Sequence, residues 1–124
     1  MLLPLTAKNV VLKLLGFGSV LALGKSLRPT LYPSAPPILA TATVLTLVGA
    51  VADLVIVPKL GNLPSLNLGF PGMTSIIWGT AKLWPRTNVS LAQAATLALM
   101  AAPIEYILHR MVLQNIGRQS AGHR

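Results

Sequence analysis

Four long apolar segments, separated by short stretches rich in proline, glycine and basic residues, make up most of the chain. The clearest segment, residues 38–57, would be about 30 Å long as an α-helix, at ~1.5 Å per residue. That length matches the hydrocarbon thickness of a bilayer, in which a helix satisfies its own backbone hydrogen bonds. The pattern predicts an all-α, polytopic membrane protein with four transmembrane helices, at residues 5–24, 38–57, 68–84 and 91–113.

Two of these segments have an alternative interpretation. The segment at 5–24 resembles a secretory signal, but Lys8 and Lys13 reach far into its apolar run and no polar domain follows. The segment at 68–84 is near the minimum length for a span, and Pro71 disturbs its beginning. A tilted or partly re-entrant segment is therefore the alternative to a full crossing there.

Short polar connections predict that the four helices form two hairpins, with both termini on the same side of the membrane. The acid-containing stretch 53–56 is echoed by 105–108, which suggests a duplicated hairpin, although chance similarity is a competitor in so biased a composition. More basic residues lie on the side of the termini, and this bias favours a cytoplasmic location for both. The polar tail after residue 113 is expected to be mobile.

The composition supports a single membrane domain covering residues 1–124. Hydrophobic residues make up 53% of the chain and charged residues 10%, against about 25% charged in soluble domains. The net charge of +8 comes from basic residues spread singly between apolar runs, which argues against nucleic-acid binding. With no cysteine and two histidines, the chain has no recognisable cofactor or metal site. The expected partner is the lipid bilayer, and a homo-oligomer could form through alanine- and glycine-rich faces.

The only two acids, Asp53 and Glu105, both lie inside apolar segments. A buried charge in a bilayer costs at least about 2.5–3.5 kcal/mol, and basic partners at matching depth reduce that cost. The predicted topology brings both acids toward the side of the termini, together with three basic side chains. The sequence therefore predicts an intramembrane polar cluster of Lys13, Asp53, Glu105, His109 and Arg110, with Lys59, Trp78 and Trp84 as anchors at the membrane interfaces.

Two functions are compatible with this cluster. A static network would orient the helices of a structural or interaction protein, which is the favoured interpretation. A proton or cation pathway through a small transporter or channel is the alternative, since intramembrane acids and histidine are common relay groups. No serine lies in a recognisable arrangement with a base, so an enzyme is not expected.

The stretch 53–62, the short third segment with Trp78, and Glu105 followed by His109 and Arg110 resemble the YndM-like family. These are uncharacterised small four-helix membrane proteins of Bacillus and related spore-forming bacteria. The resemblance covers about residues 45–113 and implies a bacterial cell-membrane location and a four-helix architecture, without a mechanism.

The chain departs from the family pattern at three places. It has Ala52 where a glycine is common, Lys59 where an arginine is common, and Asn67 where an acid usually begins the third span. The missing acid makes an ion-relay role harder to carry over to this chain.

Overall fold

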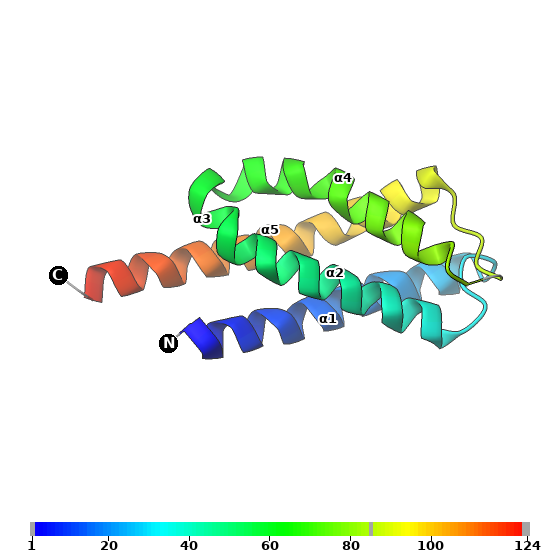
Figure 1. The fold of residues 1–124 in the computed structure, drawn as a ribbon, viewed down its shortest axis with the longest axis horizontal. Helices are drawn as coiled ribbons and strands as arrows, with labels where there is room; N and C mark the ends of the chain where they lie inside the picture. Colours follow the sequence, from blue (N-terminus) through cyan, green and yellow to red (C-terminus); the bar gives the residue numbers. More distant parts are fainter. Residues whose placement is uncertain (1, 85, 123–124) are drawn as a thin grey trace.

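The computed structural model describes the backbone of residues 2–84 and 86–122, and the side chains of residues 7–84 and 86–114. The described chain is all α-helical, as the sequence predicts, with four long helices and one short one (Figure 1). The helices are α1 (Leu2–Leu27), α2 (Ala35–Val55), α3 (Val57–Leu60), α4 (Asn62–Ala81) and α5 (Leu91–Gly122).

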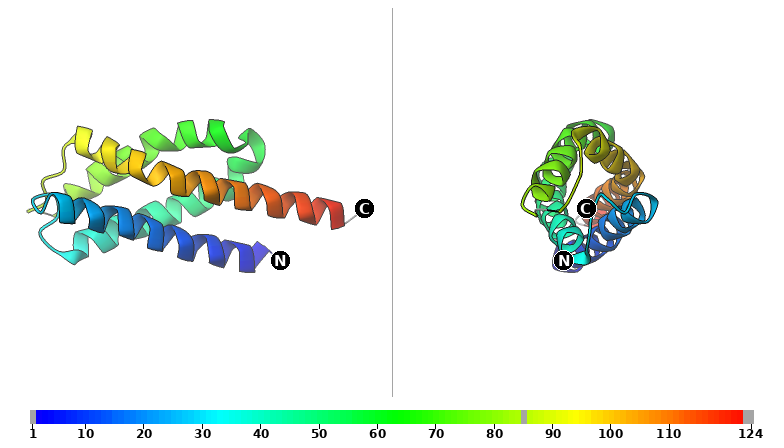
Figure 2. Two further views of the ribbon diagram at one scale, coloured as in Figure 1. Left: turned by 180° about the vertical axis from the view of Figure 1, so that it is seen from behind. Right: turned by 90° about the vertical axis from the view of Figure 1, so that its right-hand side faces the viewer.

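The four long helices run up and down around a common axis, so that α1 and α2 form one antiparallel hairpin and α4 and α5 form another (Figure 1). Each long helix packs against the next around a ring, with α1 beside α5 and α2 beside α4 (Figure 2). The short helix α3 closes the end at which both ends of the chain lie, and the two hairpin loops lie at the other end (Figure 1).

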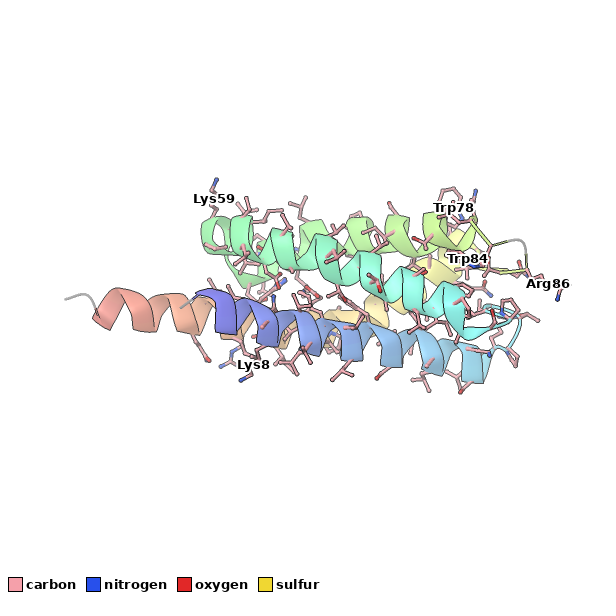
Figure 3. The ribbon with its side chains drawn as sticks, turned by 60° about the horizontal axis from the view of Figure 1, so that its bottom comes forward. Lys8, Lys59, Trp78, Trp84 and Arg86 are labelled. Carbon is pink, nitrogen blue, oxygen red and sulfur yellow. The ribbon has the colours of Figure 1, made fainter. Side chains whose placement is uncertain are left out.

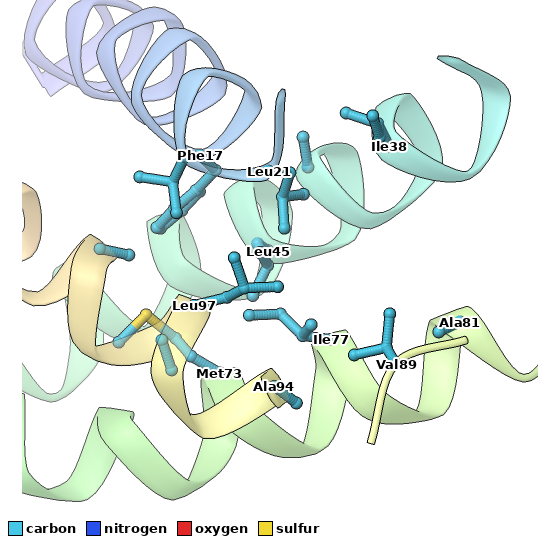
Figure 4. Packing of buried hydrophobic residues seen from close by; sticks show 14 of the residues in the cluster. Phe17, Leu21, Ile38, Leu45, Met73, Ile77, Ala81, Val89, Ala94 and Leu97 are labelled. Atoms are coloured by element: carbon cyan, nitrogen blue, oxygen red, sulfur yellow. The ribbon is translucent and has the colours of Figure 1, made fainter. Parts of the chain in front are cut away.

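An apolar core fills the half of the bundle nearest the hairpin loops (Figure 4). Phe17 and Leu21 of α1 and Ile77 of α4 are almost fully buried in it. Ala94 and Ala98 are also fully buried, and such small residues let neighbouring helices approach closely.

Local sequence signals explain most helix boundaries. The hydroxyl of Ser90 accepts a hydrogen bond from the backbone N–H of Gln93, and the Gln93 side chain accepts one from the N–H of Ser90. This reciprocal capping box starts α5. Gly61, with φ of 83°, lies in the left-handed region that favours glycine, and it allows the chain to turn from α3 into α4.

The helix α4 does not coincide with the predicted third segment, 68–84. The helix begins at Asn62, because Pro64 lies in its first turn, where a missing backbone N–H breaks no intrahelical hydrogen bond. It ends at Ala81, so Trp84 lies in the following turn. The helix α5 continues into the polar tail after residue 113, as far as Gly122.

Three of the long helices are long and apolar enough to cross a membrane: Ala7–Leu27, Ala35–Val55 and Leu91–Gln114. Within the described residues α4 does not reach the same hydropathy, because polar residues, glycines and Pro71 interrupt it. Many large apolar side chains point outward, including Leu15, Leu47 and Leu99, each about 60% exposed. An apolar exterior on helices of this length identifies a small helical membrane protein.

A backbone hydrogen bond connects the two hairpin loops, which lie at the same end of the bundle. The backbone N–H of Asn88, between α4 and α5, donates to the carbonyl of Leu31, between α1 and α2. Tyr32, the next residue after Leu31, is fully buried, and burial raises the pKa of its hydroxyl to about 12, with a smaller opposing effect from the Thr41 side chain. Tyr32 therefore stays uncharged at neutral pH.

Candidate functional site

Lys13 of α1 is the centre of a buried group of charges. Its side chain is 0% exposed, and its Nζ atom lies 3.0 Å from Oδ2 of Asp53 and 2.5 Å from Oε1 of Glu105. The ammonium also lies 5.6 Å from the centre of the Phe17 ring, within the range of a cation–π interaction. One positive charge thus contacts two negative charges from two other helices, α2 and α5.

The backbone of α2 leaves room for this ammonium at Gly49. A methyl group on Gly49 would lie 3.2 Å from Nζ of Lys13, which is closer than ordinary van der Waals contact. A glycine at this position therefore lets the lysine reach both acids.

His109 completes the group from α5. Its Nε2 atom lies 3.0 Å from Oε2 of Glu105 and 3.2 Å from Oδ1 of Asp53. Its Nδ1 atom lies 3.0 Å from Oδ1 of Asn62, whose amide nitrogen donates to the backbone carbonyl of Tyr106. Because that donation directs the Asn62 oxygen at the ring, both ring nitrogens face acceptors, and both are satisfied when each carries a hydrogen.

The resulting charges balance. With His109 doubly protonated, as the acceptors at both of its ring nitrogens favour, Lys13 and His109 supply two positive charges and Asp53 and Glu105 supply two negative charges. Asn9 adds a neutral donor, with its Nδ2 atom 2.8 Å from Oδ2 of Asp53. We call Lys13, Asp53, Glu105 and His109 the ionic cluster, and Asn9 and Asn62 its flanking amides. Together these side chains link all four long helices.

Four of the five side chains predicted to form a polar cluster lie together, and Arg110 does not. Arg110 is exposed, because one residue after His109 the helix has turned by about 100°. Sequence reasoning missed both flanking amides. Asn9 had a signal, since it precedes Lys13 by one helical turn on the same face, whereas Asn62 had only its place in the Gly-Asn turn.

The three predicted interface anchors lie at opposite ends of the bundle (Figure 3). Lys59 is exposed on α3, at the end of the chain termini. Trp78 and Trp84 are half-buried near the hairpin loops, and Lys82 places its ammonium 3.6 Å from the centre of the Trp78 ring. The anchors thus mark both ends of the bundle, a lysine at one end and two tryptophans at the other.

Three members of the ionic cluster have the chemistry of metal ligands. One oxygen each from Asp53 and Glu105 and one nitrogen of His109 all lie within 4.8 Å of one another. Carboxylate and imidazole donors of this kind suit a divalent cation. In this structure the Lys13 ammonium contacts both carboxylates, so the chain itself supplies positive charge to them.

A cavity of about 200 Å³ reaches the ionic cluster from between α2 and α4. Asp53, Glu105 and His109 form part of its wall, together with Ser65, and the rest is mostly apolar. The cluster is therefore accessible to a molecule that enters between these two helices.

No family model, curated protein or solved structure matches the chain. The resemblance to the YndM-like family stays a prediction.

Proposed function

We propose that this protein is a four-span membrane bundle with a structural or interaction role. In it, the ionic cluster is a static network of ion pairs that holds the helices together. The observation that carries the proposal is the position of Lys13, fully buried and in contact with the acids of two other helices. A transported cation would have to displace a covalently attached ammonium from the same carboxylates.

The pairing of the cluster supports a static role. Each carboxylate oxygen has a hydrogen-bond or ion-pair partner: Lys13 and Asn9 at one oxygen of Asp53, His109 at the other, and Lys13 and His109 at the two of Glu105. Burying charges is costly unless they are paired and hydrogen-bonded, and removing one partner leaves an uncompensated charge.

The fourth crossing, by α4, is part of the proposal. Its 20 residues give about 30 Å, one hydrocarbon thickness. Its contacts with both α2 and α5, two helices long and apolar enough to span a membrane, support a crossing. The same proposal includes a bacterial cell membrane, cytoplasmic termini, membership of the YndM-like family, and no enzymatic activity. Self-association is a separate prediction, to be tested by cross-linking in native membranes.

Ion flux through sealed liposomes tests the static role. Reconstituted protein should leave an imposed proton or potassium gradient as stable as in protein-free liposomes. A channel-forming peptide added at the end of each trace shows that the gradient was measurable. Flux that appears with the wild-type chain and disappears with Glu105→Gln would contradict the static role.

That outcome would favour the second candidate, a small proton or cation transporter. One observation supports this candidate: Asp53, Glu105 and His109 all line the cavity, so three ionisable side chains are accessible from one side. The flux assay separates the two candidates because only a transporter requires these groups to exchange ions.

A further inference from the structure

The cavity between α2 and α4 has an apolar part and a polar part. Leu45 and Val48 of α2 and Met73 and Ile76 of α4 form much of the apolar part. Its volume of about 200 Å³ exceeds that of apolar cavities of about 150 Å³ that bind a benzene molecule. It is smaller than the roughly 300–1,000 Å³ of typical sites for drug-sized ligands. One short hydrocarbon chain fits these limits, and the two chains of a bilayer phospholipid do not.

Ser65 gives the polar part an unused hydrogen-bonding group. Its side chain is buried, 4% exposed, and lines the cavity, and its hydroxyl has no partner among the described residues. A buried hydroxyl without a partner is unfavourable, whereas a hydroxyl paired with a ligand is not. Ser65 thus points to an occupant with a hydrogen-bonding head.

The charge balance of the ionic cluster indicates that the head group of the molecule in the cavity is uncharged. Two positive and two negative side chains already pair with one another, so an ammonium or carboxylate in the cavity would add an uncompensated charge. A hydroxyl adds none, and it can both donate to and accept from Ser65.

Two glycines of α4 also line the cavity. Gly69 and Gly72 of α4 line it, and a Cβ added at either position would meet no atom within 4 Å. A larger side chain at Gly72 can therefore fill the cavity without colliding with the bundle. Gly79 has equally open surroundings on the same helix and does not line the cavity, so it offers a matched control.

We propose that this cavity binds a single-chain lipid alcohol, with its hydroxyl on Ser65 and its hydrocarbon chain between α2 and α4. This ligand site goes beyond the structural role proposed above and does not depend on the absence of ion flux. The hydroxyl lies next to the ionic cluster, and the chain leads from it toward the surrounding lipid.

Photolabelling tests the site with a photoreactive octanol that carries a diazirine on its chain. Full-length protein in detergent is irradiated with the probe, and labelled residues are mapped by mass spectrometry. Labelling should concentrate on the stretch 65–76 of α4 and on the facing part of α2. Excess octanol should compete, and octylamine or octanoate at the same concentration should not.

Three variants separate binding in the cavity from contact at the apolar exterior. Gly72→Leu should reduce labelling about tenfold, equivalent to a loss of about 1.4 kcal/mol, and Gly79→Leu should leave it unchanged. Ser65→Ala should weaken competition by octanol without lowering the thermal stability of the unliganded protein, because its hydroxyl has no partner to lose. Labelling spread evenly over outward-facing residues, or undiminished in Gly72→Leu, would overturn the proposal. Protection by octylamine instead of octanol would also overturn it, because the cavity would then prefer a cation.

Discussion

The ammonium group of Lys13 contacts two carboxylates that come from different helices, and the His109 ring contacts the same pair from the other side. Each charge is therefore compensated by groups on more than one helix. Removal of a single member leaves an excess charge in a buried place, and removal of one acid together with one base restores the balance.

Lys13→Met should lower the free energy of unfolding by about 3–5 kcal/mol, because it leaves two buried carboxylates with only one positive partner. Adding Glu105→Gln should recover part of that loss, since Asp53 and His109 then form a balanced pair. Denaturant titration in mixed micelles, monitored by tryptophan fluorescence, measures both variants and gives their coupling energy.

Arg110→Gln is the control for the Lys13 and Glu105 substitutions, because Arg110 is next to the cluster residue His109 in sequence but is exposed. Its effect should stay within about 0.5 kcal/mol. If the Lys13 and Glu105 effects were simply additive, the two side chains would not stabilise each other.

Much of the cluster could be predicted because a charge inside an apolar run is costly and requires a partner. Lys13, Asp53, Glu105 and His109 are predictable in this way. Asn62 is not, since an amide carries no charge and the residue occurs in an ordinary turn motif. Arg110 was included wrongly, because depth in the membrane was considered without the direction in which the helix presents the residue.

At the scale of helices, close approach of α1 and α5 depends on glycine. A Cβ built on Gly16 would lie 2.9 Å from Cγ2 of Ile104, a contact that real side chains do not make. A Cβ built on Gly18, two residues further along α1, would have no atom within 4 Å. The two glycines therefore differ in packing although they share a helix.

Gly16→Leu should destabilise the protein by about 1–3 kcal/mol relative to Gly18→Leu, as expected for overpacking. Both substitutions gain similar helix propensity, so this gain cancels in the comparison. The measurement is the thermal midpoint of the two variants in the same detergent. Equal midpoints would show that α5 can shift away from α1 at no cost.

The sequence predicts the number of long helices well and their limits less well. Apolar length identifies α1, α2 and α5, because each can satisfy its backbone only as a helix in lipid. Proline and glycine were interpreted as breaks near α4, yet Pro64 lies in a first turn and Pro71 is accommodated inside the helix. The polar tail continues α5 because polarity alone does not prevent helix formation.

At the scale of the whole molecule, the exterior is apolar and the charges are concentrated inside and at the two ends. Thr30 and Asn88 are exposed at the hairpin loops, and Lys59 is exposed at the other end. These three positions test whether α4 crosses the membrane.

Single cysteines at these positions can be labelled without interference, since the chain has none of its own. With four crossings and cytoplasmic termini, a membrane-impermeant maleimide added to intact cells should label Thr30→Cys and Asn88→Cys, but not Lys59→Cys. Lysed cells, in which all three should react, provide the control. Asn88→Cys behaving like Lys59→Cys would show that α4 does not cross.

The two hairpins divide the ionic cluster evenly. The hairpin of α1 and α2 contains Lys13 and Asp53, which contact each other, and the hairpin of α4 and α5 contains Glu105 and His109, which also contact each other. With four crossings, each half can therefore enter the bilayer during synthesis with its cluster charges already paired, before the other half has emerged from the ribosome. Docking then adds the contacts between halves, from Lys13 to Glu105 and from His109 to Asp53. Assembly in the membrane can thus proceed in two stages without exposing an unpaired charge to lipid.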